Sequence, residues 1–466
     1  MRLTAAEIAQ AADGQVIAGD EAAVATSYSI DSRTLAPGAC FAALVAKRDG
    51  HDYVPDAFAR GATVALVAHA IDLRTGSEPR ALVRVGDPLV ALAELGRLAR
   101  DRLVDTTVVG ITGSAGKTTT KDLLAAALGR ARRVVASPGS FNNEAGLPLT
   151  LLAADTETEV VVAEMGARLA GNIADLCAIA RPRLGILTNV GLAHAGRLGG
   201  RAGVAAVKGE LLEALPADGV AVLDADDDVT PDLARRTAAR VLRIGRGPHS
   251  DCHVRITEVV LDDDLRPSFH LDAPAGSLAV RLRLRGEHQV MNAAMAAAVA
   301  LELGVAADDV VAGLSEAEAA PWRMQLAHAP GGITVLNDAY NASPTSTDVA
   351  LRALARLPTA GRRWAVLGEM LELGAEAEPA HTAVGRQAAD SGVDVVVVVG
   401  DAARAVAEGA RSSGRGVEIV EVPDVATAYE VVAARVGPGD AVLVKASRAV
   451  GLERVADALA GLEAVS

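Results

Sequence analysis

The stretch from Gly110 to Leu124, GITGSAGKTTTKDLL, most constrains what this chain can fold into. An apolar run precedes it and an amphipathic run follows, so it predicts a strand, a glycine turn and a helix in succession. Backbone N–H groups in such a turn, together with the N-terminus of the helix, hold the phosphates of a nucleotide. The sequence therefore predicts an open α/β sheet with this turn at the carboxyl end of one of its strands.

Within the turn, Lys117 is placed to reach the outer phosphates and Thr118 to bind Mg²⁺. The strict spacing G-x-x-x-x-G-K-[ST] fails at one position, because Ile111 stands where the first glycine would be. The alternative is a glycine turn with a surface lysine, and the flanking strand and helix disfavour it. We expect the nucleotide to be bound by Gly113, Ser114, Ala115, Gly116, Lys117, Thr118 and Thr119.

Composition excludes several classes of protein. A net charge of −14 argues against general affinity for nucleic acid, which needs a basic face. Three cysteines without paired spacing disfavour a disulfide framework or a zinc cluster. No apolar run approaches a membrane span, and Glu7 and Asp13 stand where a signal peptide would be apolar. We expect a cytoplasmic enzyme that is not embedded in a membrane.

The pattern along the 466 residues predicts an α/β protein with three domains. Short elements come first, and regular strand–helix alternation begins near Leu103 with apolar strands typical of a buried parallel sheet. Between Cys252 and Arg285 the period changes to two, which predicts a small antiparallel addition. Alternation resumes after Pro321. The predicted domains are residues 1–101, 102–320 and 321–466.

Polar residues follow several predicted strands of the middle domain. Glu164 ends one strand, where its carboxylate could coordinate the Mg²⁺ held by Thr118; an ordinary solvated glutamate is the alternative. Thr188, Asn189 and His194 follow the next strand, in the same predicted crevice.

Further polar groups lie in predicted loops. Asn142 and Asn143 suit substrate contacts, although asparagine also favours turns and caps. In the third domain, Asp338 ends a strand where a ribose hydroxyl could be held. Another strand ends in three residues suited to a carboxylate or phosphate, Lys445, Ser447 and Arg448. Each group could also be a plain turn.

With these residues in hand, the chain resembles the Mur ligase family over essentially its whole length. The matching motifs are DSRTLAPGACFAAL, KRDGHDY, TGSAGKTTTK, NNEAGLPLTLL, EMGARLAGNIADLCAIARP, TNVGLAHAGRLGG, VKGELL, NDAYNASPTS, LGEMLELG and VKASR. The phosphate loop and the AH turn occur across the family. NNEAGLP, EMGARLAGNI, DAYNASP and LGEMLELG resemble the branch that adds D-alanyl-D-alanine. The tetrapeptide DNPR, typical of the branch adding diaminopimelate or lysine, is absent.

The resemblance implies a central P-loop ATPase domain between an N-terminal UDP-sugar domain and a C-terminal Rossmann-like domain for the amine substrate. It implies that ATP phosphorylates the terminal carboxylate of UDP-N-acetylmuramoyl-tripeptide. D-alanyl-D-alanine would then attack the acyl phosphate, a step of peptidoglycan precursor synthesis. It further implies Mg²⁺ as cofactor. A monomer is expected, although the sequence leaves the oligomeric state open. Whether the third residue of the tripeptide is lysine or diaminopimelate stays open, as do the kinetic order and the open or closed arrangement of the domains.

The resemblance also carries roles onto residues. Catalytic and metal-binding roles fall on Lys117, Thr118, Glu164, His194 and Lys208, and nucleotide contacts on Asn292, Arg323 and Asp338. The UDP sugar is expected on Ser32, Arg33, Lys47, Arg48, Asp49 and His51, where positive charge gathers in an otherwise acidic chain; simple surface charge is the alternative. Other substrate contacts fall on Asn142, Asn143, Thr188, Asn189 and Asn341, with D-alanyl-D-alanine at Lys445, Ser447 and Arg448.

Lys208 lies on the apolar stripe of its predicted helix, which it shares with Val204, Leu211, Leu212 and Leu215. The commoner fate of such a lysine is to keep its stem buried and its amine in water. The resemblance implies instead that it is carbamylated and, with His194, holds a second Mg²⁺. Burial would help by lowering the pKa of the amine, which populates the form that reacts with CO₂.

Two departures concern fine contacts with the nucleotide: Asn337 stands where the family often has aspartate, and Gln289 where asparagine is common. Two other functions compete with the one implied. A related ligase such as folylpolyglutamate synthetase would use the same middle domain, although the DSR and KRDGHDY elements favour a UDP sugar. A plain nucleotide switch would need neither Lys208 nor a third domain lined with polar strand ends.

Overall fold

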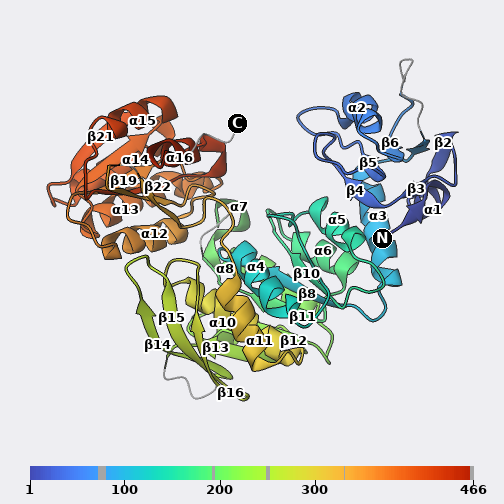
Figure 1. The fold of residues 1–466 in the computed structure, drawn as a ribbon, viewed down its shortest axis with the longest axis horizontal. Helices are drawn as coiled ribbons and strands as arrows, with labels where there is room; N and C mark the ends of the chain where they lie inside the picture. Colours follow the sequence, from blue (N-terminus) through green and yellow to red (C-terminus); the bar gives the residue numbers. More distant parts are fainter. Residues whose placement is uncertain (72–79, 192–194, 248–251, 330, 462–466) are drawn as a thin grey trace.

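The structure is a computed structural model that describes residues 1–71, 80–191, 195–247, 252–329 and 331–461. Three lobes follow one another along the chain (Figure 1). The first and third lobes stand apart from each other, and the middle lobe connects them. This is the three-domain α/β architecture predicted from the alternation of strands and helices.

The first lobe is built on a five-stranded sheet of order β2-β7-β6-β5-β4, in which only the β2–β7 pair is antiparallel. A two-stranded ladder joins β1 to β3 beside it. The elements are β1 (Leu3–Thr4), α1 (Ala5–Ala11), β2 (Gln15–Gly19), β3 (Val24–Ala25), β4 (Ser27–Ser29), β5 (Ala39–Ala42), η1 (Gly50–Tyr53), α2 (Val54–Ala59), β6 (Val64–Val67), β7 (Ala81–Arg84) and α3 (Pro88–Arg102).

The middle lobe is built on a nine-stranded sheet of order β16-β15-β14-β13-β12-β11-β8-β10-β9. Its strands are β8 (Thr107–Thr112), β9 (Val134–Ala136), β10 (Val160–Glu164), β11 (Leu184–Leu187), β12 (Val220–Asp224), β13 (Arg240–Gly245), β14 (Val254–Leu261), β15 (Pro267–Ala273) and β16 (Gly276–Arg281). Its helices are α4 (Lys117–Gly129), α5 (Gly146–Ala153), α6 (Asn172–Ala180), α7 (Ala195–Leu198), α8 (Gly200–Glu213), α9 (Thr230–Ala234), α10 (Gln289–Glu302) and α11 (Ala307–Glu316).

Strand β8 lies at the point where the order of this sheet reverses. It pairs in parallel with β10 on one side and with β11 on the other, and later strands continue outward from β11. In open parallel sheets, ligands bind outside the carboxyl ends of the strands at such a point. The glycine turn that follows β8 therefore lies at the place where a ligand site is expected.

The last three strands of this sheet form the antiparallel addition that the period of two predicts. Leu278 and Val280 are buried at 8% and 2% exposure, whereas Ala279 and Arg281 between and after them are exposed. Strand β16 ends at Arg281, although Leu282 and Leu284 continue the buried alternation. The pattern predicted the buried face correctly and overestimated the length of the strand.

The third lobe is built on a six-stranded sheet of order β17-β18-β22-β19-β20-β21, parallel except for the edge pair β17–β18. Its strands are β17 (Gln325–Ala329), β18 (Ile333–Asn337), β19 (Arg363–Leu367), β20 (Val395–Val399), β21 (Glu418–Val422) and β22 (Ala441–Lys445). Its helices are α12 (Pro344–Arg356), η2 (Gly374–Glu376), α13 (Ala377–Asp390), η3 (Asp401–Ala403), α14 (Ala405–Ser412), α15 (Val425–Ala433), η4 (Arg448–Val450) and α16 (Glu453–Leu459).

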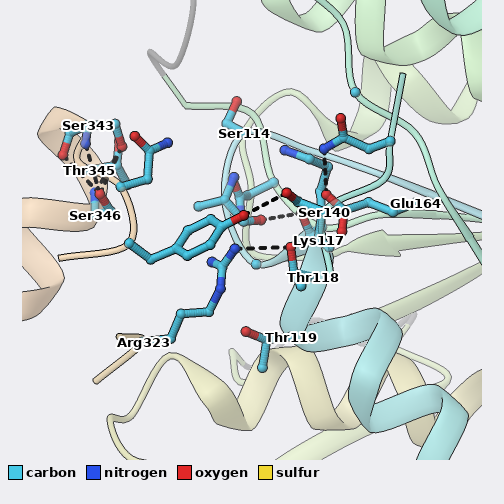
Figure 2. Close-up of a pocket in the computed structure, with 18 of the residues that line it drawn as sticks. Ser114, Lys117, Thr118, Thr119, Ser140, Glu164, Arg323, Ser343, Thr345 and Ser346 are labelled. Atoms are coloured by element: carbon cyan, nitrogen blue, oxygen red, sulfur yellow. Dashed lines mark hydrogen bonds between the residues drawn. The ribbon is translucent and has the colours of Figure 1, made fainter. Parts of the chain in front are cut away.

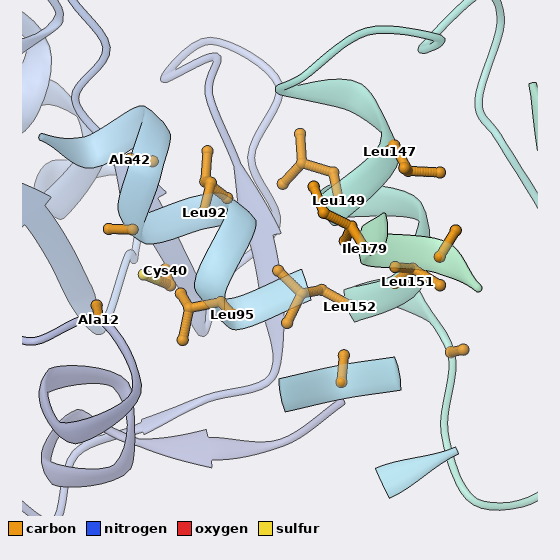
Figure 3. Packing of buried hydrophobic residues seen from close by; sticks show 14 of the residues in the cluster. Ala12, Cys40, Ala42, Leu92, Leu95, Leu147, Leu149, Leu151, Leu152 and Ile179 are labelled. Carbon is orange, nitrogen blue, oxygen red and sulfur yellow. The ribbon is translucent and has the colours of Figure 1, made fainter. Parts of the chain in front are cut away.

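The first and middle lobes share one hydrophobic core (Figure 3). Leu92 and Leu95 of α3 lie in the same buried cluster as Leu149 and Leu152 of α5. The two helices approach closely at Gly96, where an added Cβ would lie 3.0 Å from the Cβ of Pro148. This core crosses the predicted boundary between residues 101 and 102, because α3 packs against β5 and β6 of the first lobe and also against α5 and α6 of the middle lobe.

None of the helices in the described ranges combines the length and the apolar character that crossing a bilayer would require.

Candidate active site

A cavity of about 1560 Å³ lies between the middle and third lobes. Its walls include the glycine turn after β8, the ends of β10 and β11, and the third-lobe loops that follow β18 and β22. Figure 2 shows part of this wall, with Arg323 pointing from the third lobe toward the middle lobe. Of the described residues in the first lobe, Ile30 is the one that reaches the cavity.

The two glycines of the turn are required by its geometry. Gly113 and Gly116 have φ of 150° and 81°, in the region that residues with a side chain rarely adopt. A Cβ at Gly113 would lie 1.9 Å from Oγ1 of Thr188, and one at Gly116 would lie 2.6 Å from Oδ1 of Asn292. Thr188 directly follows β11 and Asn292 lies in α10, so the turn packs against both places.

Lys117 begins α4 and curls back over the turn. Its ammonium donates a hydrogen bond to the carbonyl oxygen of Gly113 at 2.9 Å. Burial lowers the pKa of Lys117, and the nearby carboxylate of Glu164 partly opposes this shift. An anion bound in the turn would replace the carbonyl of Gly113 as the partner of Lys117 and would form an ion pair with its ammonium.

Glu164 is buried at the end of β10, at 1% exposure. Its Oε1 accepts a hydrogen bond from Nδ2 of Asn142 at 2.8 Å, whereas Oε2 is buried without a hydrogen-bond partner in the described part of the chain. An unpartnered buried carboxylate oxygen is unfavourable unless a cation or donor is supplied. With the hydroxyl of Thr118 on the same wall, the oxygen donors fit Mg²⁺.

Arg323 connects the two lobes. Its Nη2 donates to Oγ1 of Thr118 at 3.1 Å (Figure 2). Its guanidinium lies over the ring of Tyr340 at 3.9 Å. The hydroxyl of Tyr340 in turn lies 2.6 Å from Oγ of Ser140 in the middle lobe. Nε of Arg323 is buried without a partner within the described ranges, so one donor remains for a ligand.

The backbone around Arg323 is strained and held from both sides. Trp322 and Met324 have φ of 57° and 50°, which costs energy for residues with bulky side chains. The indole N–H of Trp322 donates to Oδ2 of Asp457 at 3.3 Å. The N–H of Met324 donates to Oδ1 of Asp338 at 3.0 Å. These bonds hold Arg323 in the direction of the glycine turn.

Lys208 is buried on α8, at 1% exposure, and its neighbours Val204, Leu211 and Leu212 are fully buried. Within the described ranges its ammonium makes no hydrogen bond or ion pair. Burial lowers the pKa of Lys208 to about 7, and the charge of Lys117 adds to this shift. The amine therefore does not reach out to water, contrary to the commoner fate of such a lysine.

Three predicted substrate residues make contacts with the backbone of the site itself. Thr188 donates to the carbonyl oxygen of Ala115 at 2.6 Å, and the amide of Asn189 bonds both the N–H and the carbonyl of Ala115 at 3.0 Å. Asn143 accepts from the N–H of Gly146 at 2.9 Å and so caps the start of α5. His194 lies outside the described residues.

The third-lobe residues predicted to hold a carboxylate are partly engaged with one another. Lys445 pairs with Oδ2 of Asp338 at 2.5 Å and donates to the carbonyl oxygen of Asn341 at 2.8 Å. Ser447 accepts from the N–H of Leu371 at 2.9 Å. Arg448 pairs with Glu453 and lies over the Trp322 ring at 4.2 Å. All three residues line the cavity, and Arg448 is the half-exposed one.

The predicted sugar-binding residues of the first lobe lie outside the cavity wall. Arg33 pairs with Asp31 at 2.7 Å and is 81% exposed, and Arg48 reaches the hydroxyl of Tyr53 at 3.4 Å. Lys47 is exposed and Ser32 is buried at 6%.

His51 is fully engaged inside the first lobe. Its Nδ1 lies 2.6 Å from Asp49, and Nε2 accepts from the N–H of Ala68 at 2.8 Å. Together with His69 these side chains have the spacing of a metal site. Both ring nitrogens of His51 are already used, so the geometry favours a braced turn.

Several residues of the site were not predicted. Tyr340 and Ser140 join the lobes, and Asp457 holds Trp322. Gln289, noted above as a departure, accepts from Nδ2 of Asn292 at 2.8 Å. In a chain with 2% aromatic residues, a tyrosine within a polar strand-end motif was the one available signal. Asn337, at the departure noted above, donates to Asp457 at 3.1 Å and so also supports Trp322.

Two family models match the chain. One describes the Mur ligase middle domain and covers residues 111–300. The other describes the Mur ligase, glutamate ligase domain and covers residues 322–448.

A UDP-N-acetylmuramoyl-tripeptide–D-alanyl-D-alanine ligase of Mycobacterium tuberculosis H37Rv is 43% identical, over 98% of both chains. Among solved structures, MurF from Acinetobacter baumannii has a TM-score of 0.85 at 30% identity and covers 99% of both chains. A UDP-N-acetylmuramoylalanyl-D-glutamyl-2,6-diaminopimelate–D-alanyl-D-alanyl ligase of the same species has a TM-score of 0.81 at 30% identity, with 98% of both chains covered. MurF of Thermotoga maritima in complex with ADP has a TM-score of 0.77 at 29% identity, covering 93% of this chain and 97% of that one.

Proposed function

The chain belongs to the Mur ligase family, and from that premise we propose that it joins D-alanyl-D-alanine to UDP-N-acetylmuramoyl-tripeptide with consumption of ATP. The observation that carries this function is that one cavity is lined both by the glycine turn after β8, called the phosphate turn from here on, and by the strand ends of the third domain. A reaction that first transfers a phosphoryl group and then accepts an amine needs both walls.

The chemistry follows from the poor reactivity of a carboxylate. An oxygen of the tripeptide's terminal carboxylate attacks the γ-phosphorus of ATP, ADP leaves, and an acyl phosphate forms. The amine of the dipeptide attacks the acyl carbon, loses a proton, and phosphate leaves as the amide bond forms. Lys117 stabilises the charge that moves with the phosphoryl group, and Arg323 brings a second cation from the third domain.

Mg²⁺ would be held by Thr118 and by the unpartnered Oε2 of Glu164. When bound it would neutralise phosphate charge. Asn142 fixes the Glu164 carboxylate by its other oxygen, at 2.8 Å, and so holds it in place before the ion arrives.

Lys208 is proposed to react with CO₂ and form a carbamate. A buried amine with its pKa lowered to about 7 is partly neutral at neutral pH, and only the neutral amine reacts. The product is an anion with oxygen ligands, which suits a second Mg²⁺, whereas an ammonium would repel it. His194 is the proposed partner in that site and lies outside the described residues.

The substrates are proposed to occupy separate parts of the molecule. The nucleotide lies against the phosphate turn, with Asn292 at its base and Asp338 and Arg323 on the side of the third domain. Lys445, which pairs with Asp338, supports this nucleotide wall, and Arg448 is the residue proposed to bind the carboxylate of the dipeptide. The UDP sugar is proposed to bind on the first domain. The cytoplasmic setting and the monomeric state expected from the sequence remain predictions.

Phosphate release from ATP tests this function. We expect release only when both UDP-N-acetylmuramoyl-tripeptide and D-alanyl-D-alanine are present, with an amide product detected by mass spectrometry. Substituting a folate and glutamate for the two substrates tests the related-ligase alternative. Release without either substrate would identify a plain nucleotide switch and would contradict the proposal.

A further inference from the structure

The loop of residues 166–172, which follows Glu164 and leads into α6, is held rigidly. The N–H of Gly166 donates to the carbonyl oxygen of Asn142 at 2.7 Å. Oδ1 of Asn172 accepts from the N–H groups of Arg168 and Leu169 at 3.1 and 3.0 Å. Glu210 of α8 accepts from Gly171 and, at the start of α6, from Ala174 at 2.7 and 3.0 Å. The side chains of Asn172 and Glu210 and the main-chain carbonyl of Asn142 thus satisfy the loop's backbone.

This rigid loop presents its two largest side chains to the cavity. The side chain of Arg168 is 70% exposed and Leu169 is 58% exposed, and both line the cavity wall. Leu371, 39% exposed, and Glu372 line the cavity from the third domain. Leu169 and Leu371 thus expose apolar side chains on the wall of one cavity, where a bound ligand can cover them.

The ion pair of Arg168 in this structure is a loose one. Its Nε lies 3.8 Å from Oε1 of Glu372, beyond hydrogen-bond distance, with the two side chains 70% and 34% exposed. Exposed pairs of this kind contribute little to stability. A carboxylate ligand that formed two parallel hydrogen bonds with the guanidinium would be a stronger partner.

The position of the loop indicates which substrate passes it. Ile30 of the first domain lines the cavity, as do Leu176 and Ile179 of α6, the helix that this loop begins. Lys117 lines the same cavity at the phosphate turn. If the sugar nucleotide lies on the first domain and its terminal carboxylate reacts at Lys117, the peptide between them crosses loop 166–172.

We propose that Arg168 binds a carboxylate of the muramoyl peptide other than the reacting one, while Leu169 and Leu371 cover the apolar parts of that peptide. The inference rests on the proposed function, because it takes the peptide acceptor as substrate. Two parts of the peptide offer such a carboxylate: the glutamyl residue and, where the third residue is diaminopimelate, its second carboxylate. Both residues occur in the substrate name of the Acinetobacter baumannii relative.

The test is steady-state kinetics of Arg168→Gln against Arg183→Gln. Arg183 is an exposed arginine of the same domain that pairs with Asp218 at 3.1 Å and does not line the cavity. We expect Arg168→Gln to raise KM for the UDP-muramoyl tripeptide by about tenfold to a hundredfold, the range for hydrogen bonds to charged groups. KM for ATP and for D-alanyl-D-alanine should change less than about twofold, and the control should leave all three unchanged.

Three acceptors identify the carboxylate. One carries diaminopimelate, one carries lysine in its place, and one has its glutamyl carboxylate converted to an amide. The acceptor that lacks the bound carboxylate should be weaker with the wild type, and Arg168→Gln should weaken it no further. An unchanged acceptor KM in Arg168→Gln, or a rise confined to the KM for the dipeptide, overturns the inference. If the wild type releases no phosphate with any acceptor, the proposed function fails instead.

Discussion

The middle domain contacts its two neighbours through two interdomain interfaces, here called seams, that differ in chemistry. Toward the first domain the seam is an apolar core, with Leu92 and Leu95 packed in one cluster with leucines of α5 (Figure 3). Toward the third domain the contacts around the cavity are polar: Arg323 bonds Thr118, Tyr340 meets Ser140, and Glu287 is held by Arg246 and Arg356. Farther along this interface, Leu265 of the middle domain lies in the buried apolar cluster of the third domain. The cavity that holds the phosphate turn lies at the polar seam.

The contrast indicates how the domains divide the work. Separating the first domain would expose apolar surface to water, so the shared core holds that domain in place. Separating the third domain would expose Leu265 and would otherwise exchange polar contacts for contacts with water, at smaller cost. A ligase that must admit three substrates and then exclude water needs one domain that can move away from the active-site cavity and close over it again. The polar seam supplies that wall.

The largest effect should come from the polar seam and leave the fold untouched. Lys117→Ala removes the cation at the phosphate turn, so we expect kcat to fall by about 10²- to 10³-fold, as for other groups that stabilise developing charge. Thermal unfolding should be nearly unchanged, because the ammonium's partner is a single carbonyl oxygen. Activity within tenfold of the wild type would remove Lys117 from the mechanism.

The apolar seam should give the opposite result. Leu95 is fully buried in the shared cluster, so Leu95→Ala should lower the free energy of unfolding by about 3 kcal/mol through lost burial and a cavity. Michaelis constants of the folded protein should stay near those of the wild type. Val90→Ala on the same helix, where Val90 is 58% exposed, serves as the control and should change stability little. Equal losses in free energy of unfolding in the two variants would show that burial of Leu95 in this interface adds nothing to stability.

A third effect concerns the buried amine behind the polar seam. With the pKa of Lys208 lowered to about 7, the folded state binds fewer protons than the unfolded state between that pH and the ordinary lysine pKa. Stability therefore rises with pH across that window. Lys208→Met removes the cost of burying the charge, so in CO₂-free buffer it should stabilise the fold by about 4 kcal/mol near pH 7 and by about 1 kcal/mol near pH 10.

The companion variant tests the carbamate. Lys208→Ala should lose most activity and regain part of it when a short-chain carboxylic acid is added, because the acid replaces the anion. Full activity in Lys208→Ala without added acid would show that the lysine is a packing residue only.

A smaller effect is expected from the first domain, whose cations lie outside the cavity. The double variant Arg33→Ala, Arg48→Ala should raise the dissociation constant of the UDP-muramoyl peptide by about tenfold, since each arginine is exposed and any phosphate contact is screened by water and salt. Isothermal calorimetry measures it. Unchanged affinity would place the sugar nucleotide elsewhere.

The smallest effect should come from Glu287, whose carboxylate bonds Arg246 at 2.6 Å and also pairs with Arg356 of the third domain. Burial acts to raise the pKa of Glu287, but the two arginines outweigh it and the net pKa is lowered. The contribution is therefore present above the ordinary glutamate pKa and is lost as pH falls. Glu287→Gln should change unfolding by less than about 1 kcal/mol. Small-angle scattering should show a more extended average shape.

What could be predicted from the sequence was local. The spacing of residues within a short segment was enough to predict three features: the glycine turn, the buried face of residues 278–284 and the apolar face around Lys208. Contacts between distant segments left no such signal. Lys445 and Asp338 are 107 residues apart, and each was assigned to a ligand separately before the structure paired them. The pattern of α3 shows an apolar stripe but does not show that α3 also packs against helices α5 and α6 of the middle domain, so this apolar interface was not predicted.

The strained segment around Arg323 also gives the protein an internal optical probe. The chain has two tryptophans. Trp364 is fully buried in the third domain, so its fluorescence should stay constant while the fold is intact. Trp322 lies next to Arg323, under the guanidinium of Arg448 and bonded to Asp457, so its emission depends on the charges around it. Binding of a nucleotide at Arg323, or of a carboxylate at Arg448, should change the fluorescence of Trp322. The fluorescence of Trp364 should stay constant and serve as the internal reference.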